Sequence, residues 1–311
     1  MLVALAGGTG AARFLRGLVS VVPPEEVVVV VNTADDDVFH GLHVSPDLDT
    51  VTYTLAGAAG EEGWGLAGET FAAIDALERY GRPTWFRLGD RDLATHVYRT
   101  ERLRVGATLS EVAAEIAVAW GVRARLLPMS DDPVSTRIDT VSPHGGTTEL
   151  RMQEWFVRDR AEPPVAGVRF EGAAVAAPAP GVLDALARAE TILLCPSNPV
   201  ISIGPILAVP GIRAALARRR ERVVGVSPII AGAPVKGPAD RLMAPLGMEV
   251  SCVGVARAYA DVCGTLVIDA GDAARAPEVE AAAVRAVVAE TLMTDARVAA
   301  ALARHTLRAV A

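Results

Sequence analysis

A short apolar segment, a glycine-rich turn and an amphipathic helix open the chain, and this order is the strongest constraint on its fold. Leu2–Ala6 has the length and apolar character of a buried strand, and Gly7–Gly10 follows it directly. The spacing then predicts a helix over Ala11–Val21, ended by Pro23, and a second strand over Val27–Val31. Two strands joined by a crossover helix form a βαβ unit, which places them in a parallel sheet.

The rest of the chain keeps alternating between helix and strand patterns, as α/β proteins do. Helices are predicted over Leu48–Leu55, Glu69–Tyr80, Leu109–Trp120, Val182–Ala189, Ile212–Arg220 and most of Glu278–Ala311. Strands are predicted over Thr84–Leu88, Arg123–Leu127, Thr191–Leu194, Arg222–Val226, Met248–Gly254 and Leu266–Ile268. From residue 129 to about residue 172 the pattern changes to short Thr- and Arg-rich strands, including Thr148–Gln153 and Gly167–Phe170.

These patterns predict one Rossmann-like unit with a smaller addition. The expected fold class is α/β, with a mostly parallel sheet that carries helices on both faces. A chain of 311 residues is long enough for one large α/β domain. We expect a single unit over residues 1–311, in which 1–128 and 182–311 form the core and about 129–181 form a smaller inserted α/β lobe.

Composition excludes several classes of protein. The formal net charge of −7 would repel nucleic acid. Although 51% of the residues are hydrophobic, no apolar run approaches the roughly 20 residues that a membrane span needs. The N-terminus lacks the basic and long apolar regions of a signal peptide, so we expect a cytoplasmic protein. Cys195, Cys252 and Cys263 show no CxxC spacing, which predicts reduced, buried thiols.

The glycine-rich turn is a candidate phosphate site. Backbone N–H groups at a helix N-terminus favour anions, and Gly8, Thr9 and Gly10 stand at such a terminus. Arg13, one turn into the helix, adds a guanidinium suited to phosphate oxygens. The turn is not a dinucleotide fingerprint, because Arg13 stands where the third glycine belongs, and no GK[ST] follows as in a Walker loop. A tight turn without a ligand is the alternative.

An acidic stretch follows the second predicted strand. Asn32–Thr50 contains five aspartates, namely Asp35, Asp36, Asp37, Asp47 and Asp49. Carboxylates this close repel one another unless a cation lies among them, and Mg²⁺ prefers such oxygen ligands beside substrate phosphates. We predict Mg²⁺ ligands at Asp35, Asp36 and Asp49 and a nucleotide contact at Asn32. The alternative is a solvated loop in which Asp47 or Asp49 caps the next helix.

Two later loops end predicted strands with small, polar or rigid residues, which let the backbone approach a ligand closely. One contains Ser197 and Asn198, and the other begins with Ser227. The carboxyl ends of parallel strands share one edge of a sheet, so these loops and the glycine turn together predict a nucleotide cleft. Lys236, the one lysine of the chain, is expected at the surface.

A charged motif follows the predicted strand Thr84–Leu88. Arg87 lies inside that strand, where a charge needs a partner. Gly89–Asp92 comes next, and His96 and Arg99 follow it. The motif stands at the edge where parallel sheets bind ligands, although alternating charge equally fits an ion-pair network.

Together these motifs resemble those of the 2-phospho-L-lactate transferase family, which makes the deazaflavin coenzyme F-420. The resemblance is carried, in chain order, by GGTG (Gly7–Gly10), NTADD (Asn32–Asp36), SPDLDT (Ser45–Thr50), LGDRDLATH (Leu88–His96), LLPMSDDPVSTRI (Leu126–Ile138), QEWFV (Gln153–Val157), PSNPVISIGPIL (Pro196–Leu207), SPIIAGAPVKGPADRLM (Ser227–Met243) and TLMTD (Thr291–Asp295). These long motifs extend over nearly the whole chain.

The resemblance implies a Mg²⁺-dependent transfer on a Rossmann-like fold. A guanosine diphosphate ester of 2-phospholactate, or of phosphoenolpyruvate in many bacterial members, gives its phosphoacyl group to 7,8-didemethyl-8-hydroxy-5-deazariboflavin, and GMP leaves. The resemblance places deazaflavin contacts at Asp49, within SPDLDT, and at Arg87, just before LGDRD, where some relatives carry lysine. It also implies a homodimer.

Asp49 is the residue that we expect to be catalytic. It could hold Mg²⁺, orient the attacking hydroxyl or act as a base, and the sequence does not separate these roles. Nor does the sequence separate a lactyl from an enolpyruvyl donor. A non-catalytic nucleotide-binding regulator on a related fold is a second hypothesis. A dinucleotide-dependent oxidoreductase is a third, weakened by Arg13 in place of a glycine.

Overall fold

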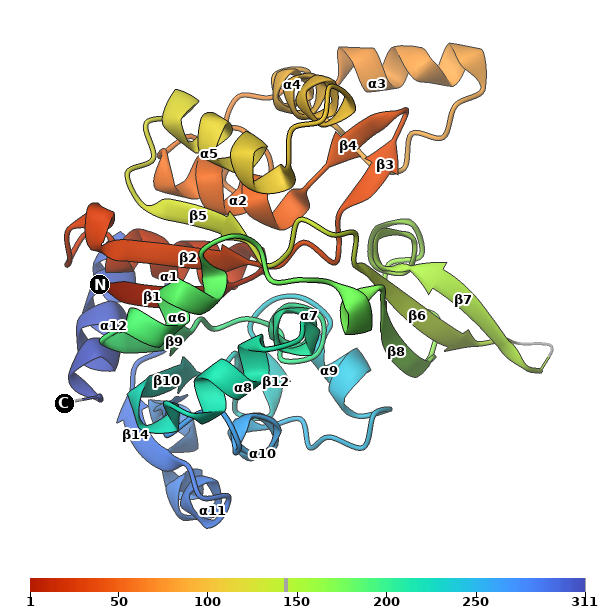
Figure 1. Ribbon diagram of the computed structural model, residues 1–311. Coiled ribbons are helices and arrows are strands. Elements are labelled where there is room, and N and C mark those ends of the chain that lie inside the picture. The colour runs from red at the N-terminus through yellow and green to blue at the C-terminus, as the bar shows by residue number, and fades with distance from the viewer. Residues whose placement is uncertain (143–144, 311) are drawn as a thin grey trace.

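A seven-stranded parallel sheet forms the centre of the molecule (Figure 1). The computed structural model describes residues 1–142 and 145–310. The strands of this sheet are β1 (Leu2–Ala6), β2 (Val27–Val31), β5 (Arg125–Pro128), β9 (Thr191–Leu194), β10 (Val223–Val226), β13 (Thr265–Asp269) and β14 (Arg285–Ala289). Their order is β14-β13-β10-β9-β1-β2-β5, and every neighbouring pair is parallel. The expected α/β class with a mostly parallel sheet is confirmed.

The strand order reverses beside β1. The chain runs outward from β1 to β2 and β5, and then returns to the other side of β1 with β9. In open α/β sheets the crevice outside the carboxyl ends at such a point is where ligands bind. The loops after β1 and β9 meet there, since the N–H of Gly7 donates to Ser197 Oγ at 3.4 Å. A Cβ at Gly10 would lie only 2.5 Å from the carbonyl oxygen of Pro196, so this position requires glycine.

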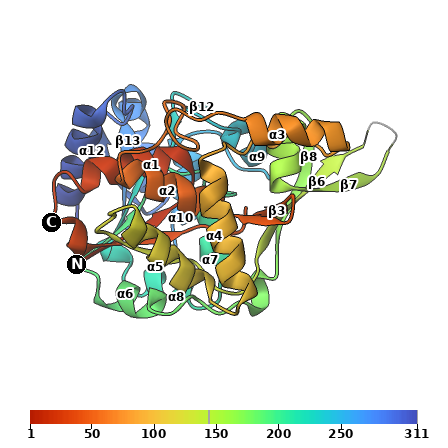
Figure 2. The same ribbon diagram turned by 90° about the horizontal axis from the view of Figure 1, so that it is seen from above.

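Helices cover both faces of the sheet because its strands are apolar on both sides. In β2, Val27, Val29 and Val31 belong to one apolar cluster, and Val28 and Val30 belong to the other. The first cluster includes α1 (Gly8–Leu18), α2 (Pro46–Leu55), α5 (Leu109–Ala119) and α12 (Ala296–Arg308). The second includes α6 (Val182–Arg188), α7 (Ile203–Ala208), α8 (Ile212–Ala217), α10 (Cys252–Tyr259) and α11 (Ala276–Ala281). Figure 2 shows α1, α2 and α5 with α4 (Asp92–Arg104) as neighbours in front of the sheet.

A smaller antiparallel sheet projects from the body (Figure 1). Its strands are β6 (Ser135–Val141), β7 (Thr147–Arg151) and β8 (Val165–Glu171), in the order β7-β6-β8. Ile138 and the fully buried Trp155 belong to the same apolar cluster as Val28 and Val30 of β2. The small sheet and the central sheet therefore share one hydrophobic core.

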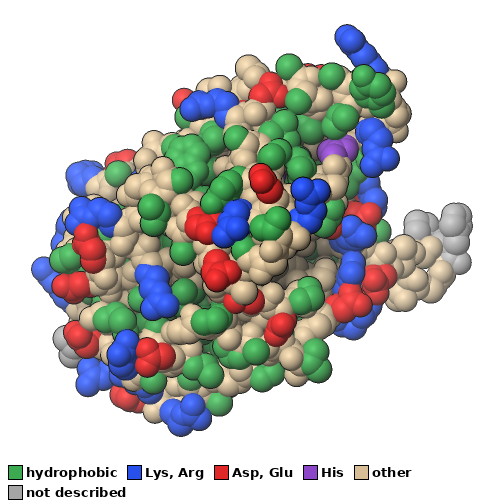
Figure 3. Space-filling view, turned by 45° about the horizontal axis from the view of Figure 1, so that its top comes forward, with side chains coloured by type: hydrophobic (Ala, Val, Ile, Leu, Met, Phe, Trp, Pro, Cys, Tyr) green, Lys and Arg blue, Asp and Glu red, His purple; other side chains and the backbone are tan. Residues whose placement is uncertain are grey.

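Short elements complete the chain around the crevice. They are the hairpins β3 (Asp37–Phe39) with β4 (Leu42–Val44) and β11 (Ile229–Ile230) with β12 (Ala233–Pro234), and the helices α3 (Ala72–Leu77) and α9 (Ala239–Met243). The three cysteines are free and buried, as predicted. No helix within residues 1–142 and 145–310 has both the length and the apolar character to cross a bilayer. On the face seen in Figure 3, basic side chains are interspersed with acidic ones.

Three predicted elements are wrong. Thr84–Leu88 is a loop, because its aromatic side chains pack against the β3–β4 hairpin; the rings of Phe86 and Phe39 stack with centroids 3.8 Å apart. Met248–Gly254 is not a strand, since the Ser251 side chain accepts the N–H of Gly254 and caps α10. Arg285–Ala289 was expected to be helical but pairs with β13, because an apolar run this short does not distinguish strand from helix.

The close contact between α1 and α12 predicts that replacing Gly17 by alanine destabilises the protein, although alanine is the better helix former. Helix propensity alone favours alanine over glycine by about 1 kcal/mol, so Gly17→Ala would stabilise an isolated α1. A Cβ at Gly17 would, however, lie 2.4 Å from both the carbonyl carbon and oxygen of Ala299 in α12. We expect Gly17→Ala to lower the free energy of unfolding by about 1–3 kcal/mol in urea denaturation. The control Arg16→Ala, at an exposed position of the same helix, should change it little; a stabilised Gly17→Ala would contradict this packing.

Candidate active site

A cleft of about 1010 Å³ lies at the carboxyl ends of the strands, where the strand order reverses. Most of the residues predicted to form the site line it, namely Gly8, Thr9, Gly10, Arg13, Asp35, Asp49, Arg87, Ser197, Asn198 and Ser227. Asn32 and Asp36 do not line it. The structure thus brings together segments that lie far apart in the sequence.

The glycine turn is tied directly to the acidic stretch. The N–H of Gly8, which begins α1 with φ at +74°, donates to Asp47 Oδ1 at 2.8 Å. A Cβ at Gly7 would lie 2.8 Å from both Asp47 Oδ2 and Ser202 Cβ, so a larger residue has no room there. Asp47 therefore does not cap its own helix, and it occupies one of the backbone donors that we expected to face phosphate.

Asn32 holds two buried carboxylates side by side. Its Nδ2 donates to Asp35 Oδ2 and to Asp47 Oδ2, both at 3.0 Å, and its Oδ1 accepts the N–H of Ala34. Asn32 is fully buried beneath the cleft. Its position supports a role in arranging the aspartates, and not the direct nucleotide contact that we expected.

The shared amide leaves the two carboxylates short of positive partners. Burial, and then the charge of Asp47, raise the pKa of Asp35 well above its ordinary value. Burial raises the pKa of Asp47 to about 6, although Asn32 and Gly8 donate hydrogen bonds to it. Within the described chain, the buried Asp35 Oδ1 has no hydrogen-bond partner. Two buried carboxylates that line one cleft and share a single amide are suitable ligands for a divalent cation.

Asp36 and Asp37 serve the β3–β4 hairpin instead. Asp36 Oδ2 accepts a hydrogen bond from Ser45 Oγ at 2.6 Å and lies 3.2 Å from His43 Nε2. Asp37 pairs with Arg151 of β7 at 2.8 Å. Asp36 therefore does not join the predicted metal set in this arrangement, because its side chain is directed to the hairpin and away from the cleft.

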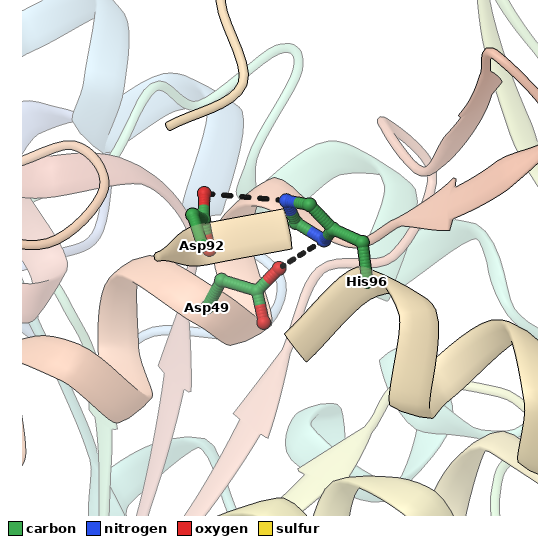
Figure 4. A group of neighbouring side chains, drawn as sticks. All are labelled: Asp49, Asp92 and His96. Carbon is green, nitrogen blue, oxygen red and sulfur yellow. Dashed lines mark ion pairs between the residues drawn. The ribbon is translucent and has the colours of Figure 1, made fainter. Parts of the chain in front are cut away.

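Asp49 lies in a buried network of charged side chains (Figure 4). Its Oδ1 accepts a hydrogen bond from Nη2 of Arg99. His96 stands between two carboxylates, with Nδ1 3.8 Å from Asp49 Oδ2 and Nε2 3.2 Å from Asp92 Oδ2. Arg99 Nη1 lies 3.2 Å from His96 Nδ1; because a guanidinium only donates, this contact is a hydrogen bond when Nδ1 is unprotonated. Sequence analysis noted Arg99 but did not identify it as the partner of Asp49.

The network leaves one oxygen of Asp49 free. Burial raises the pKa of Asp49, against the opposing charges of Arg99 and His96. Burial also acts to raise the pKa of Asp92, but hydrogen bonds from His96 and from Tyr53, whose hydroxyl lies 2.5 Å away, lower it overall. Asp49 Oδ2 has no hydrogen-bond partner among the described residues, and Asp49 lines the cleft. This oxygen can accept a hydrogen bond or a proton from a bound hydroxyl.

Asp49, Asp92 and His96 also satisfy the spacing of a metal site, since one ligand atom from each lies within 4.8 Å of the others. Arg99 already supplies positive charge to Asp49 there. A cation added beside that guanidinium would be repelled, so Asp35 and Asp47 form the better metal pair.

Arg87 lines the cleft from a loop and not from a strand. Its Nη1 lies 2.5 Å from Asp75 Oδ1, and its guanidinium carbon lies 4.7 Å from the centre of the Phe71 ring. Trp85 and Phe86 line the cleft beside it. This aromatic wall, defined by Phe71, Trp85 and Phe86, was not predicted, although the Trp-Phe pair directly before Arg87 in the sequence indicated it.

Part of the charged motif after Arg87 has a structural role. Asp90 accepts hydrogen bonds from the Thr70 hydroxyl and from the N–H groups of Ala72 and Ala73, at the start of α3. Glu69 accepts the N–H groups of Arg91 and Asp92. Asp90 therefore anchors the start of α3, while Asp92 supports the network around Asp49.

The Arg99–Asp49 pair generates a stability prediction. Arg99→Met would leave a buried carboxylate without its cation, and we expect the free energy of unfolding to fall by about 3–5 kcal/mol. Adding Asp49→Asn should recover part of the loss, because a neutral amide is cheaper to bury. Urea denaturation of the two single variants and the double variant measures this coupling. Arg213→Met, which breaks a surface pair with Asp261 at 2.7 Å, is the control; an equal effect of both arginine variants would contradict the prediction.

Comparison with known proteins identifies the family of the chain. The model of the family described as 2-phospho-L-lactate transferase CofD matches residues 2–308. A phosphoenolpyruvate transferase from Kitasatospora aureofaciens is 48% identical, over 98% of this chain and 96% of its own length. A 2-phospho-L-lactate transferase from Methanosarcina mazei is 41% identical, over 94% and 95%. The crystal structure of a UPF0052 family member from Bacillus halodurans shares the fold, with a TM-score of 0.64 at 16% identity over 98% of each chain. The chain therefore belongs to the 2-phospho-L-lactate transferase family and is a transferase of coenzyme F-420 biosynthesis.

Proposed function

We propose that the protein transfers an enolpyruvyl phosphate group from enolpyruvyl-2-diphospho-5'-guanosine to 7,8-didemethyl-8-hydroxy-5-deazariboflavin. GMP leaves, and the product is dehydro coenzyme F-420-0. The observation that carries the choice of donor is the identity of 48% and 47% to relatives named phosphoenolpyruvate transferase, against 41% to the 2-phospho-L-lactate transferase of Methanosarcina mazei. A lactyl donor is the alternative. By resemblance, we also propose a cytoplasmic homodimer.

The two halves of the cleft support the two substrates of this reaction. The aromatic wall offers apolar ring surfaces against which the deazaflavin ring can pack, and the Arg87 guanidinium lies over one of them, the Phe71 ring. The glycine turn, Arg13 and Ser197 line the other half, where helix N-terminal N–H groups and a cation favour phosphate. Asp49 lines the same cleft, and its buried Oδ2 has no hydrogen-bond partner among the described residues. In this proposal the acceptor hydroxyl becomes that partner.

We propose Asp35 and Asp47 as the protein ligands of Mg²⁺. The unpartnered Asp35 Oδ1 and the raised pKa values of Asp35 and Asp47 fit this assignment. Asp49, predicted as a ligand from sequence, is left out because it already pairs with Arg99. Asp36, predicted from sequence, is left out because it does not line the cleft, and Ser45 and His43 engage its Oδ2 on the hairpin side. When bound, Mg²⁺ supplies charge neutralisation at the diphosphate oxygens.

Asp49 acts on the attacking group in this proposal. The acceptor hydroxyl oxygen forms a bond to the phosphorus distal to guanosine, and the bond from that phosphorus to the bridging oxygen breaks, so that GMP departs with the electron pair. The hydroxyl proton passes to Asp49 Oδ2, while Arg99 holds the other oxygen and fixes the direction of the carboxylate. Catalysis then depends mainly on positioning and electrostatic stabilisation.

The activity prediction follows from these roles. With donor, deazaflavin and Mg²⁺ present, we expect release of GMP and a product with two hydrogen atoms fewer than the lactyl product, measured by mass spectrometry. Asp49→Asn should lower kcat by about 10²–10⁴-fold, as for loss of a general base. Asp240→Asn, at an exposed position, should keep normal turnover. Exclusive use of the lactyl donor would overturn the donor assignment, and GDP binding without deazaflavin binding would favour a non-catalytic regulator.

The metal assignment predicts a pH-dependent stabilisation by Mg²⁺. At 100 times its dissociation constant, Mg²⁺ should add about 2.7 kcal/mol to the free energy of unfolding at neutral pH. Without metal, a raised carboxyl pKa means that the folded state binds more protons, so stability falls as pH rises through about 6, the pKa of Asp47. Below that pH protonation competes with Mg²⁺, and the stabilisation should disappear.

Thermal unfolding with and without MgCl₂, on both sides of this pH, measures the effect. Asp35→Asn should abolish the stabilisation by Mg²⁺, whereas Asp36→Asn should retain it. The opposite result in the two variants would restore the metal set predicted from sequence.

A further inference from the structure

Two loops far apart in the sequence meet over the cleft. Residues 60–66, which follow α2, and residues 234–238, which precede α9, contribute to its lining, and we call them together the cover. Lys236 joins them, because its Nζ donates to the carbonyl oxygen of Glu62 at 2.5 Å across a separation of 174 residues. The same ammonium lies 5.0 Å from the centre of the Trp64 ring, a cation–π contact.

The cover rests on the glycine turn. Gly63 has φ at +84°, and a Cβ there would lie 3.1 Å from Cγ2 and 3.3 Å from Cβ of Thr9. The loop therefore approaches Thr9 as closely as a residue without a side chain allows. Thr9 is the second residue of α1, so the cover lies directly above the helix N-terminus that favours anions.

Two cations without carboxylate partners line the cleft, namely Lys236 of the cover and Arg13 of α1. Within the described residues, neither Arg13 nor Lys236 forms an ion pair with an acidic side chain, whereas Arg87, the other arginine that lines the cleft, pairs with Asp75. Burial lowers the pKa of Lys236, and the neighbouring charge of Arg13 lowers it further. Like charges held close together over a helix N-terminus gain stability from an anion bound between them.

Lys236 is also the one lysine among the 30 lysine and arginine residues of the chain. Its ammonium has three N–H donors, of which one meets the Glu62 carbonyl. The other two are free to reach oxygens of a group that enters the cleft. A planar guanidinium would direct its donors differently, so the position suits a point charge on a flexible stem.

We propose that Lys236 is a phosphate contact that closes the cover on the donor, with the diphosphate bound between Lys236 and Arg13 above the glycine turn. This inference rests on the proposed function for the identity of the donor. The bound phosphate reduces the repulsion between the two like charges. It also adds a contact at Lys236 to the hydrogen bond that already joins the two loops. Donor binding and closure of the cover are then a single event.

The single lysine makes a direct test possible. Acylation of the full-length protein by an N-hydroxysuccinimide ester modifies two kinds of amine, the ε-amine of Lys236 and the α-amine of Met1, and peptide mass spectrometry separates them. GDP with Mg²⁺ should slow acylation of Lys236 at least about tenfold, and guanosine should not, because guanosine carries no phosphate. The α-amine of Met1, which pairs with Glu190 at 3.0 Å, is the internal control and should react at an unchanged rate. Equal rates at Lys236 with and without GDP would overturn the proposal.

Variants provide a second measurement by calorimetry. Lys236→Met should weaken GDP binding at least about tenfold and leave deazaflavin binding unchanged, as expected for loss of a charged hydrogen bond. Lys236→Arg, which keeps the charge but directs its donors differently, should recover only part of the GDP affinity. The control Arg218→Met, at an exposed position on the chain after α8, should bind GDP normally. Wild-type GDP affinity in Lys236→Met would contradict the contact.

These measurements need no acceptor and no turnover, so they fail independently of the proposed reaction. A protein that protects Lys236 with GDP but transfers nothing would support the phosphate contact and contradict the transferase chemistry. A protein that turns over normally while Lys236 stays unprotected would overturn the contact alone.

Discussion

The arrangement of the cleft depends on how several buried carboxylates are stabilised in a small volume. Asp35, Asp47 and Asp49 are all buried at the carboxyl ends of the strands, where a carboxylate is costly unless it is paired. Arg99 neutralises Asp49, and a single amide from Asn32 is divided between Asp35 and Asp47. The ion pair with Arg99 fixes the Asp49 carboxylate and leaves one of its oxygens without a hydrogen-bond partner in the part of the chain that the structure describes. The amide shared by Asp35 and Asp47 leaves a deficit of positive charge, which is why we propose the metal on that side of the cleft.

The fold was predictable to the extent that local patterns determine it. Helices cover both faces of the strands Leu2–Ala6 and Val27–Val31. Strands buried on both faces have uninterrupted apolar sequences, so these two could be recognised from the sequence. The edge strand Arg285–Ala289 was missed, because its helical and strand patterns are equally good and only pairing with β13 decides between them. Thr84–Leu88 failed for the opposite reason, since its apolar residues serve a ring stack and not a sheet.

The site was predictable by residue type and less so by geometry. Glycines, aspartates and strand-end loops pointed to the correct edge of the sheet, because parallel topology gathers those ends together. Which of five aspartates face the cleft depends on hydrogen bonds from segments that are distant in sequence, such as Ser45 Oγ to Asp36 and Gly8 N–H to Asp47. Lys236 was expected at the surface and is indeed exposed, yet its ammonium bridges two loops above the cleft. Local pattern carries no information on such contacts.

The β3–β4 hairpin has a mechanical consequence. At one end Asp37 pairs with Arg151 of the small sheet, and at the other Phe39 stacks on Phe86 of the aromatic wall. The small sheet and the wall are thus joined through a rigid three-residue strand, and neither can be displaced alone without breaking an ion pair or unstacking two rings. Shape changes in the small sheet, which contributes few polar groups to the cleft, would therefore alter the aromatic wall. Where this wall holds the deazaflavin ring, as we propose, residues that never touch the acceptor can adjust the selectivity for it.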